Sequence, residues 1–369
     1  MTDHVPNKYT VGPAILWTPF FITAHLLTML GEYFGLPLKS DGYTVLYQWF
    51  IGLGSIIYGL LGLILIYRIC TFFFQKHVAL ISTSFVALGT NVFYYLTNEP
   101  TMSHAMSLFA VSLFAFISIQ DTEDYDLKQM FLLGLSGGLM ILIRPQNALF
   151  FVLMVPKLSW ILNIGSSSIE KFRQRMEGWG VLLFTFTMVL LPQFIVWKIL
   201  YGHYLFYSYE GEGFNFMNPH LLDTLFSARH GLISWTPGIL LSLAGLISFY
   251  KIERRFALIF SIAFILQWYI NASWHCWWFG HSFGGRAYIN CSFIFAVGIA
   301  MFLTKIDQQP IKHIMQLFFA LLILWNIQFA AQLTIGMVPG EEAVDFKQVF
   351  LNQLKLPDAI MEKFLEFKK

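Results

Sequence analysis

Charged residues are scarce in this 369-residue chain: they make up 12% of it, whereas a soluble domain usually contains about 25%. Hydrophobic residues make up 57%, and the mean hydropathy is +0.62. So few charges cannot cover so much apolar surface in water. This excludes a soluble enzyme, a disordered chain and a nucleic-acid-binding protein. The net charge of +2 gives no reason to expect a polyanionic partner.

Cysteine is also rare. Cys70, Cys276 and Cys291 lack the CxxC spacing of zinc sites and redox motifs, and they do not form a disulfide framework. We therefore expect neither a metal site nor a cofactor. Residues 1–12 are polar, without the basic region and apolar core of a signal peptide.

What the chain does contain is long apolar runs, and about 20 such residues suffice to cross a membrane. The uncharged runs of this order are Gly42–Tyr67, His77–Asn98, Pro100–Gln120, Trp179–Trp197, Gly231–Tyr250, Phe256–Trp274, Ala287–Thr304 and Ile314–Gly340. Gln129–Lys157 is interrupted by Arg144 and Pro145, and Pro13–Gly31 either spans or lies at the interface. The sequence predicts an all-α, polytopic transmembrane helix bundle with roughly ten spans.

The distribution of basic residues predicts the orientation, because cytoplasmic loops carry an excess of Lys and Arg. Twelve of the 23 basic residues fall in loops 68–77, 121–128, 157–176, 251–255 and 305–312, and six lie on the opposite side before Gly340. We therefore expect the first set of loops inside. The membrane domain would cover residues 1–340, and an amphipathic tail, 341–369, would lie on the outer face.

Arg144 interrupts an apolar stretch, and Pro145 after it breaks the helix. A cation near membrane depth is costly and usually serves a function. Arg144 either faces an anionic head group at the outer end of a cavity or extends to the interface from a helix end.

Glu99 and His104 lie between two predicted spans. Pro100 suits the first position of a helix, which would make Asn98 or Glu99 its cap. The alternative is a carboxylate and an imidazole at the mouth of a cavity. Their spacing is too loose for a metal site.

Two further outer segments contain cations beside aromatic residues and glycines. Arg229-His230-Gly231 directly precedes a span, so its donors could reach a phosphate or a sugar. In the second segment, tryptophans could stack on sugar rings or isoprenoid chains, or belong to the aromatic belt of the interface. Its candidate residues are Trp274, His275, Trp278, His281 and Arg286.

Taken together, these stretches resemble the GT-C superfamily of polytopic glycosyltransferases, and most of all the bacterial branch of protein O-mannosyltransferases and aminoarabinose transferases. The resembling pieces are Pro6–Phe20, Leu96–Leu108, Leu139–Phe150, Leu225–Pro237 and Trp274–Tyr288. The resemblance implies transfer of a sugar from a polyprenyl-phosphate lipid at the outer face of the bacterial inner membrane. It also implies that basic groups hold the phosphate and that a carboxylate acts as base. We expect Arg144, Arg229 and Arg286 to converge on one anionic pocket, with Lys8 and Tyr9 as its near wall.

The family begins with a span and an acidic outer loop, whereas this chain starts at what resembles the end of that loop. Asp3 is the one carboxylate before Pro6. Asp3, Glu99 and His104 are therefore the catalytic candidates, and we expect activity to be lost or impaired. In the family, residues 13–31 would be juxtamembrane.

Two other functions remain open. The first is a non-catalytic subunit that partners other membrane proteins. The second is a transporter of a lipid-linked sugar, although transporters usually carry polar groups at mid-span, and here the ionisable groups cluster at the outer ends. In all three cases, transferase, non-catalytic subunit or transporter, membrane lipids are an expected partner.

Overall fold

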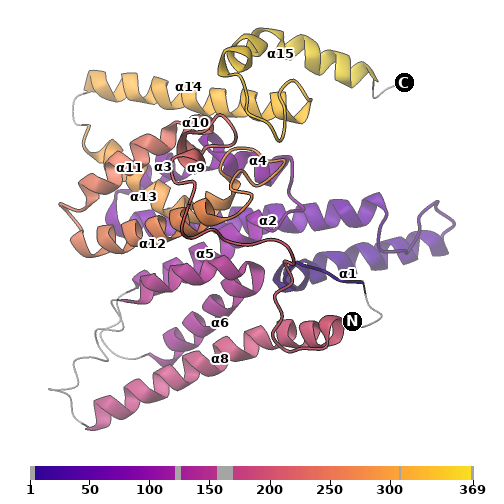
Figure 1. Ribbon diagram of the computed structural model, residues 1–369, viewed down its shortest axis with the longest axis vertical. Helices are drawn as coiled ribbons and strands as arrows, with labels where there is room; N and C mark the ends of the chain where they lie inside the picture. Colours follow the sequence, from indigo (N-terminus) through magenta and orange to yellow (C-terminus); the bar gives the residue numbers. More distant parts are fainter. Residues whose placement is uncertain (1–4, 121–125, 156–168, 307–308, 367–369) are drawn as a thin grey trace. The chain divides into compact units, whose positions relative to one another are not determined.

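The computed structural model describes residues 5–120, 126–155, 169–306 and 309–366 (Figure 1). Within these ranges the regular elements are all helices, and no β-strand forms apart from one isolated bridge between Phe214 and Trp274. The all-α prediction is therefore confirmed. The chain divides into two compact units, the first made of Met1–Leu65 and Glu99–Glu212, the second of Ile66–Asn98 and Gly213–Lys369.

The first unit contains α1, the first part of α2, and three helices that pack side by side, α5, α6 and α8 (Figure 1). The bounds are α1 Gly12–Tyr33, α2 Val45–Phe73, α5 His104–Ile119, α6 Leu127–Ile143, η1 Pro145–Met154 and α8 Ile169–Tyr201. Glycine allows the close packing. A Cβ on Gly134 would overlap the carbonyl oxygen of Leu182, and one on Gly12 would overlap that of Leu142. The start of α1 is thus held against the end of α6, next to Arg144.

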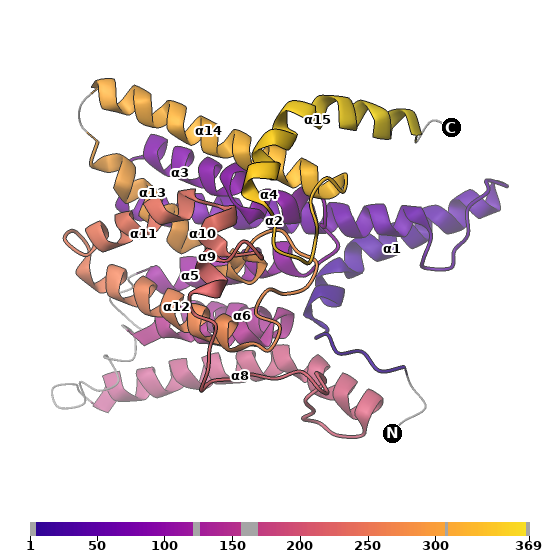
Figure 2. The same cartoon turned by 45° about the horizontal axis from the view of Figure 1, so that its top comes forward.

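The second unit is built around α13, which is almost entirely buried and packs against α3 and α11. Its elements are α3 Lys76–Gly89, α4 Asn91–Thr97, α9 Asp223–Phe226, α10 Leu232–Trp235, α11 Gly238–Phe249, α12 Arg254–Ser273, η3 Arg286–Cys291, α13 Ser292–Thr304, α14 Gln309–Thr334 and α15 Phe346–Glu366. Helices α3 and α4 meet at an angle of 66° at Thr90, whose side chain accepts a hydrogen bond from the Val92 amide. Figure 2 shows the same elements from a second direction.

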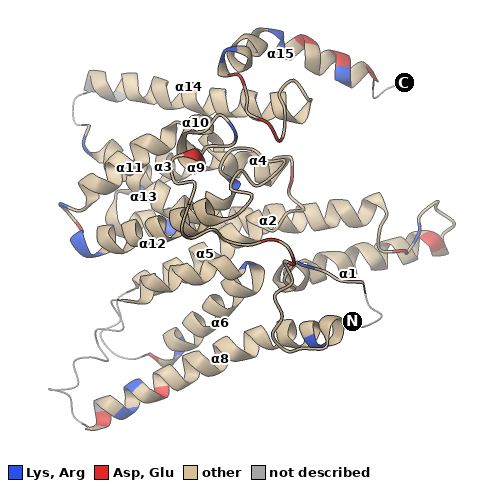
Figure 3. Cartoon of the chain, in the orientation of Figure 1, with Lys and Arg blue, Asp and Glu red and all other residues tan. Residues whose placement is uncertain are grey.

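Among the described residues, six helices are long and apolar enough to cross a membrane: α1, α2, α8, α12, η3 with α13, and α14. The bent pair of α3 and α4 makes a seventh, and α5, α6, η1 and α11 are shorter apolar helices. Figure 3 shows the charged residues gathered near helix ends and loops, with long uncharged stretches between them. The chain is therefore a multi-pass membrane protein. The described residues contain fewer full-length candidate spans than the roughly ten predicted, because breaks such as that at Arg144 divide some apolar runs.

Helices α11 and α13 approach closely because their contact is lined by small residues. A Cβ on Gly298 would overlap the carbonyl oxygen of Ser242 and lie 2.6 Å from its hydroxyl oxygen. We expect Gly298→Ala to lower the free energy of unfolding by about 1–3 kcal/mol, because the backbones must separate. Thermal unfolding of the detergent-solubilised protein would measure this.

Gly180→Ala on α8 is the matched control, since a Cβ there meets nothing within 4 Å. It should unfold at or slightly above the wild-type temperature. Equal stability of the two alanine variants would contradict the close packing of α11 on α13.

Candidate functional site

Arg144 ends helix α6 with an extended backbone, φ −149° and ψ 117°, as expected for a residue before proline. Its Nη1 lies 3.0 Å from Nδ1 of His104, the first residue of α5. With its oxygen turned toward Arg144, the Gln146 amide accepts from Nη2 and Nε at 2.8 and 3.0 Å. Arginine has only donors, so Nδ1 of His104 must be the acceptor and its ring proton sits on Nε2.

Neighbouring side chains fix this break in the chain. Asn147 is fully buried, and its amide nitrogen donates to Ser107 Oγ and to the Met140 carbonyl, both at 2.9 Å. The hydroxyl of Thr10 donates to the Ile143 carbonyl at 2.8 Å, which holds the segment before α1 against the end of α6. The Arg144 side chain is half-buried, and hydrogen bonds hold the segments around it in place.

Lys8 forms an ion pair with Glu212, with 2.7 Å between Nζ and Oε1. Its Nζ lies 5.5 Å from the ring centre of Tyr209 and 5.7 Å from that of Tyr9. The hydrogen bond to Glu212 raises the pKa of Lys8. The structure thus places Lys8 and Tyr9 beside the loop that follows α8.

Tyr209 connects these residues with Arg144. Burial raises the pKa of its hydroxyl, and the nearby charges of Arg144 and Lys8 partly oppose that rise. The first unit therefore brings Lys8, Tyr9, His104 and Arg144 into one region, which we call the first-unit group together with Tyr209. Tyr209 and Glu212 were not among the predicted site residues, because no local sequence motif marks them.

Of the two carboxylates predicted to be catalytic, Asp3 lies outside the described residues. Glu99 is half-buried at the start of a turn, and its carbonyl accepts from the Met102 amide at 3.2 Å. The prediction that Asn98 or Glu99 caps the next helix is wrong. Pro100 lies in that turn rather than in the first helical position, so α5 starts only at His104, with Ser103 as N-cap.

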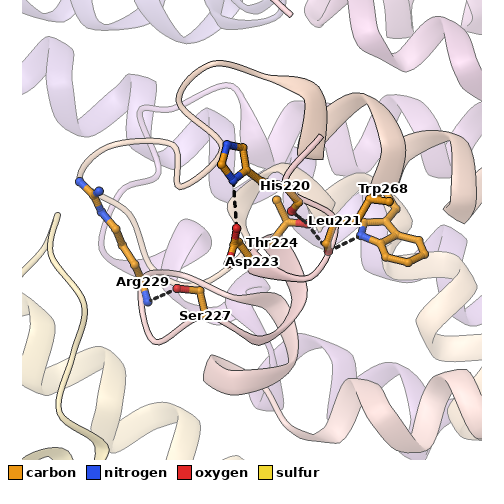
Figure 4. Close-up of polar contacts among 7 residues, drawn as sticks. All are labelled: His220, Leu221, Asp223, Thr224, Ser227, Arg229 and Trp268. Atoms are coloured by element: carbon orange, nitrogen blue, oxygen red, sulfur yellow. Dashed lines mark hydrogen bonds and ion pairs between the residues drawn. The ribbon is translucent and has the colours of Figure 1, made fainter. Parts of the chain in front are cut away.

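Arg229 is the first of the cations in the second unit. Its backbone amide donates to Ser227 Oγ at 2.9 Å (Figure 4). Its guanidinium carbon lies 3.9 Å from the ring centre of Trp278, a cation–π contact, and Nε donates to the Glu341 carbonyl at 2.6 Å. Within the described part of the chain, no carboxylate pairs with Arg229.

His230 is buried, 3% exposed, and has a left-handed backbone with φ 62°. Its ring centre lies 4.8 Å from that of Trp235, and neither ring nitrogen has a partner at hydrogen-bond distance among the described residues. Burial lowers its pKa to about 4, assisted by the charges of Arg229, Arg286 and His281, although the Gly340 backbone slightly opposes this. His230 is therefore neutral at pH 7.

Arg286 follows two glycines, and Gly284 has a left-handed φ of 59°. The Nη1 of Arg286 donates to the His281 carbonyl at 3.3 Å. Because Arg229, Arg286 and His281 all act on His230, the four residues lie together, and we call them the basic cluster. Gly340 packs directly on the His281 ring, where a Cβ would overlap it.

Trp274 and His275 make contacts of a different kind. Trp274 is bridged to Phe214, with ring centres 4.8 Å apart, and the His275 amide donates to the Gly213 carbonyl at 3.0 Å. These contacts fix the loop that begins at Gly213 on the end of α12.

The loop that begins at Gly213 also contains His220, which was not among the predicted site residues. His220 Nδ1 lies 2.9 Å from Asp223 Oδ2 (Figure 4). The His220 ring stacks on Trp277, with 5.5 Å between the ring centres. Trp268 donates to the Leu221 carbonyl at 2.9 Å. Within the described ranges, no three His, Cys, Asp or Glu side chains are grouped to hold a metal ion.

Comparisons with known proteins agree with this architecture. Residues 45–197 match the family model for dolichyl-phosphate-mannose-protein mannosyltransferase, and no curated protein matches significantly. The crystal structure of ArnT from Cupriavidus metallidurans bound to undecaprenyl phosphate is 14% identical, with a TM-score of 0.50 over 95% of this chain. The apo state of the same protein is 13% identical, with a TM-score of 0.46 over 92% of this chain.

The chain covers 62% of the ArnT chain in each case. Its fold is similar to that of ArnT. The family match and the structural match together confirm the resemblance to the ArnT-like bacterial branch that the sequence indicated.

The low pKa of His230 makes stability depend on pH. Between pH 6.5 and 4 the unfolded chain binds a proton that the folded chain excludes, so stability falls as the pH is lowered. The loss is at most roughly 3 kcal/mol for a shift from 6.5 to about 4. His230→Asn, which tolerates a positive φ, should show a smaller loss between pH 7 and 5 in thermal unfolding.

The control is His203→Asn, because His203 is an exposed loop residue. It should keep the wild-type pH dependence. If His230→Asn lost as much stability on acidification as the wild type, His230 would not be the titrating group.

Proposed function

We propose that this protein binds a polyprenyl-phosphate lipid at the outer face of a bacterial inner membrane. The observation that carries the proposal is the basic cluster. Two guanidinium groups, which remain charged at any physiological pH, lie near enough to a buried neutral imidazole to lower its pKa, and Arg229 has no carboxylate partner among the described residues. Like charges held together favour an anion, and a guanidinium matches phosphate oxygens well.

A lipid carrier suits this position better than a soluble phosphate. The guanidinium of Arg229 is stacked on Trp278, and tryptophan is typical of the membrane–water interface. The fold similarity to a protein whose structure was solved with undecaprenyl phosphate supports the same choice.

The first-unit group supports sugar transfer as the chemistry. His104 donates through Nε2, Lys8 and Arg144 are cations, and Tyr209 stays protonated because its pKa is raised. These donors suit the hydroxyl oxygens of a sugar. None of them is a base, so the proton of the acceptor must go to a carboxylate.

Glu99 is the carboxylate that we propose for this role. The acceptor hydroxyl would attack the anomeric carbon, the bond to the lipid phosphate would break, and the proton would pass to Glu99. A positioned base typically contributes 10²–10⁴-fold in rate.

The lipid-binding proposal predicts that Arg229→Ala weakens binding of undecaprenyl phosphate. A lost charged hydrogen bond costs about 1.5–3 kcal/mol, or roughly 10- to 150-fold in Kd. Binding to the purified protein can be measured by native mass spectrometry, with undecaprenol as the uncharged probe. The wild type should prefer the phosphate.

Arg173→Ala is the matched control, because Arg173 is exposed on α8 and pairs with Glu177. It should bind as the wild type does. Equal binding of undecaprenol and undecaprenyl phosphate, or full binding by a folded Arg229→Ala protein, would contradict the proposal.

The transfer proposal predicts that Glu99→Gln abolishes turnover of a polyprenyl-phosphate sugar while leaving lipid binding intact, because the amide keeps the shape but cannot accept a proton. Release of lipid phosphate from a panel of such donors gives the rate. Glu210→Gln, at an exposed loop position, is the control.

No turnover by the wild type, with phosphate-lipid binding retained, would favour the non-catalytic subunit. Movement of the intact lipid-linked sugar across the membrane would favour the transporter. Turnover that survives Glu99→Gln would assign the base elsewhere.

A further inference from the structure

Helix α15 has an apolar face that the rest of its unit leaves uncovered. Along its 21 residues the exposed large side chains recur at helical spacing, so they fall on one side. They are Phe350, Leu354, Met361, Phe364 and Leu365, all more than half exposed. Lys355, Glu362 and Glu366 project from the opposite side.

A different stripe of α15 attaches the helix to its unit. Val349, Asn352 and Leu356 are buried. The amide nitrogen of Gln332, near the end of α14, donates to the Val349 carbonyl at 3.0 Å, and Asn352 donates to the Met337 carbonyl at 3.3 Å. Figures 1 and 2 both show α15 starting beside α14 and extending away from it.

Helix α14 is one of the candidate spans, and its outward side chains suit contact with lipid. Ile314, Leu317, Leu321 and Leu324 are each at least half exposed. Its C-terminal end therefore lies where the span meets water. Because α15 is fixed to this end, its uncovered face starts at the level of the membrane–water interface.

We propose that α15 lies in the membrane–water interface with its uncovered apolar face inserted in the lipid leaflet. A lipid surface fits better than a second protein, since the lipid-facing side of α14 leads directly to this helix. The described part of α15 carries three lysines and three acidic residues, so insertion needs no anionic lipid. The proposal does not depend on lipid-phosphate binding.

The side of the membrane follows from the segment 340–344, which joins α14 to α15. The Ser282 amide donates to the Gly340 carbonyl, Arg229 donates to the Glu341 carbonyl, and the Val344 amide donates to the Ala228 carbonyl. Helix α15 is therefore on the same face as the basic cluster.

The test uses the full chain in phosphatidylcholine nanodiscs, on a Cys276→Ser background, since Cys70 and Cys291 are buried. Nitroxide labels are placed at adjacent positions, Leu354→Cys with Lys355→Cys and Met361→Cys with Glu362→Cys. All four side chains are exposed, so labelling should not disturb packing.

Labels at 354 and 361 should collide more often with oxygen, which concentrates in lipid, than with a water-soluble nickel chelate. Labels at 355 and 362 should show the reverse. Labels at 354 and 361 that met the nickel chelate as readily as their neighbours would overturn the proposal, because the face would then lie in water. Protection from both reagents would overturn it too, because protein would then cover the face.

Discussion

A cationic side chain is costly in contact with lipid hydrocarbon. In this chain, turns and helix ends place the arginines where polar groups of the protein can contact them. Arg144 stands at the end of α6, immediately before Pro145. Arg229 lies in a turn in which His230 has a left-handed backbone conformation. Arg286 comes two residues after Gly284, which has the same conformation. Arg144 lies at the end of a helix, Arg229 between two short helices and Arg286 at the start of one. In each place the guanidinium reaches a ring nitrogen or a carbonyl oxygen. Irregular backbone at such depth persists only beside protein or water.

The two groups of cations differ in the neighbouring groups that compensate their positive charge. In the first-unit group, Lys8 is paired with Glu212, and Arg144 is held by the neutral acceptors His104 and Gln146. In the basic cluster, Arg229 meets only an indole and a backbone carbonyl among the described residues, and the charges suppress protonation of the buried His230. The first group is largely satisfied within the protein, whereas Arg229 in the second has no carboxylate partner among the described residues.

Much of the architecture could be predicted because hydropathy is a local property. The apolar runs became helices, and the interruption at Arg144 was visible as a single cation before a proline. The pairing of Lys8 with Glu212 could not be predicted, since 204 residues separate them and only the fold places the segment before α1 beside the loop after α8. The start of α5 was misplaced for another reason: a proline suits both a helix start and a turn. The burial of His230 depends on a left-handed turn that no hydropathy pattern encodes.

Gly340 has a consequence for how this chain tolerates sequence variation. It lies in a short connection after the last candidate span, where hydropathy alone would predict that any small or polar residue is acceptable. Yet it packs against the His281 ring, and its carbonyl accepts from the Ser282 amide. Even an alanine Cβ there would overlap the exposed His281 ring, which would have to turn aside. A substitution at position 340 would therefore be felt first by a residue of the basic cluster, so the connection between α14 and α15 takes part in positioning that cluster.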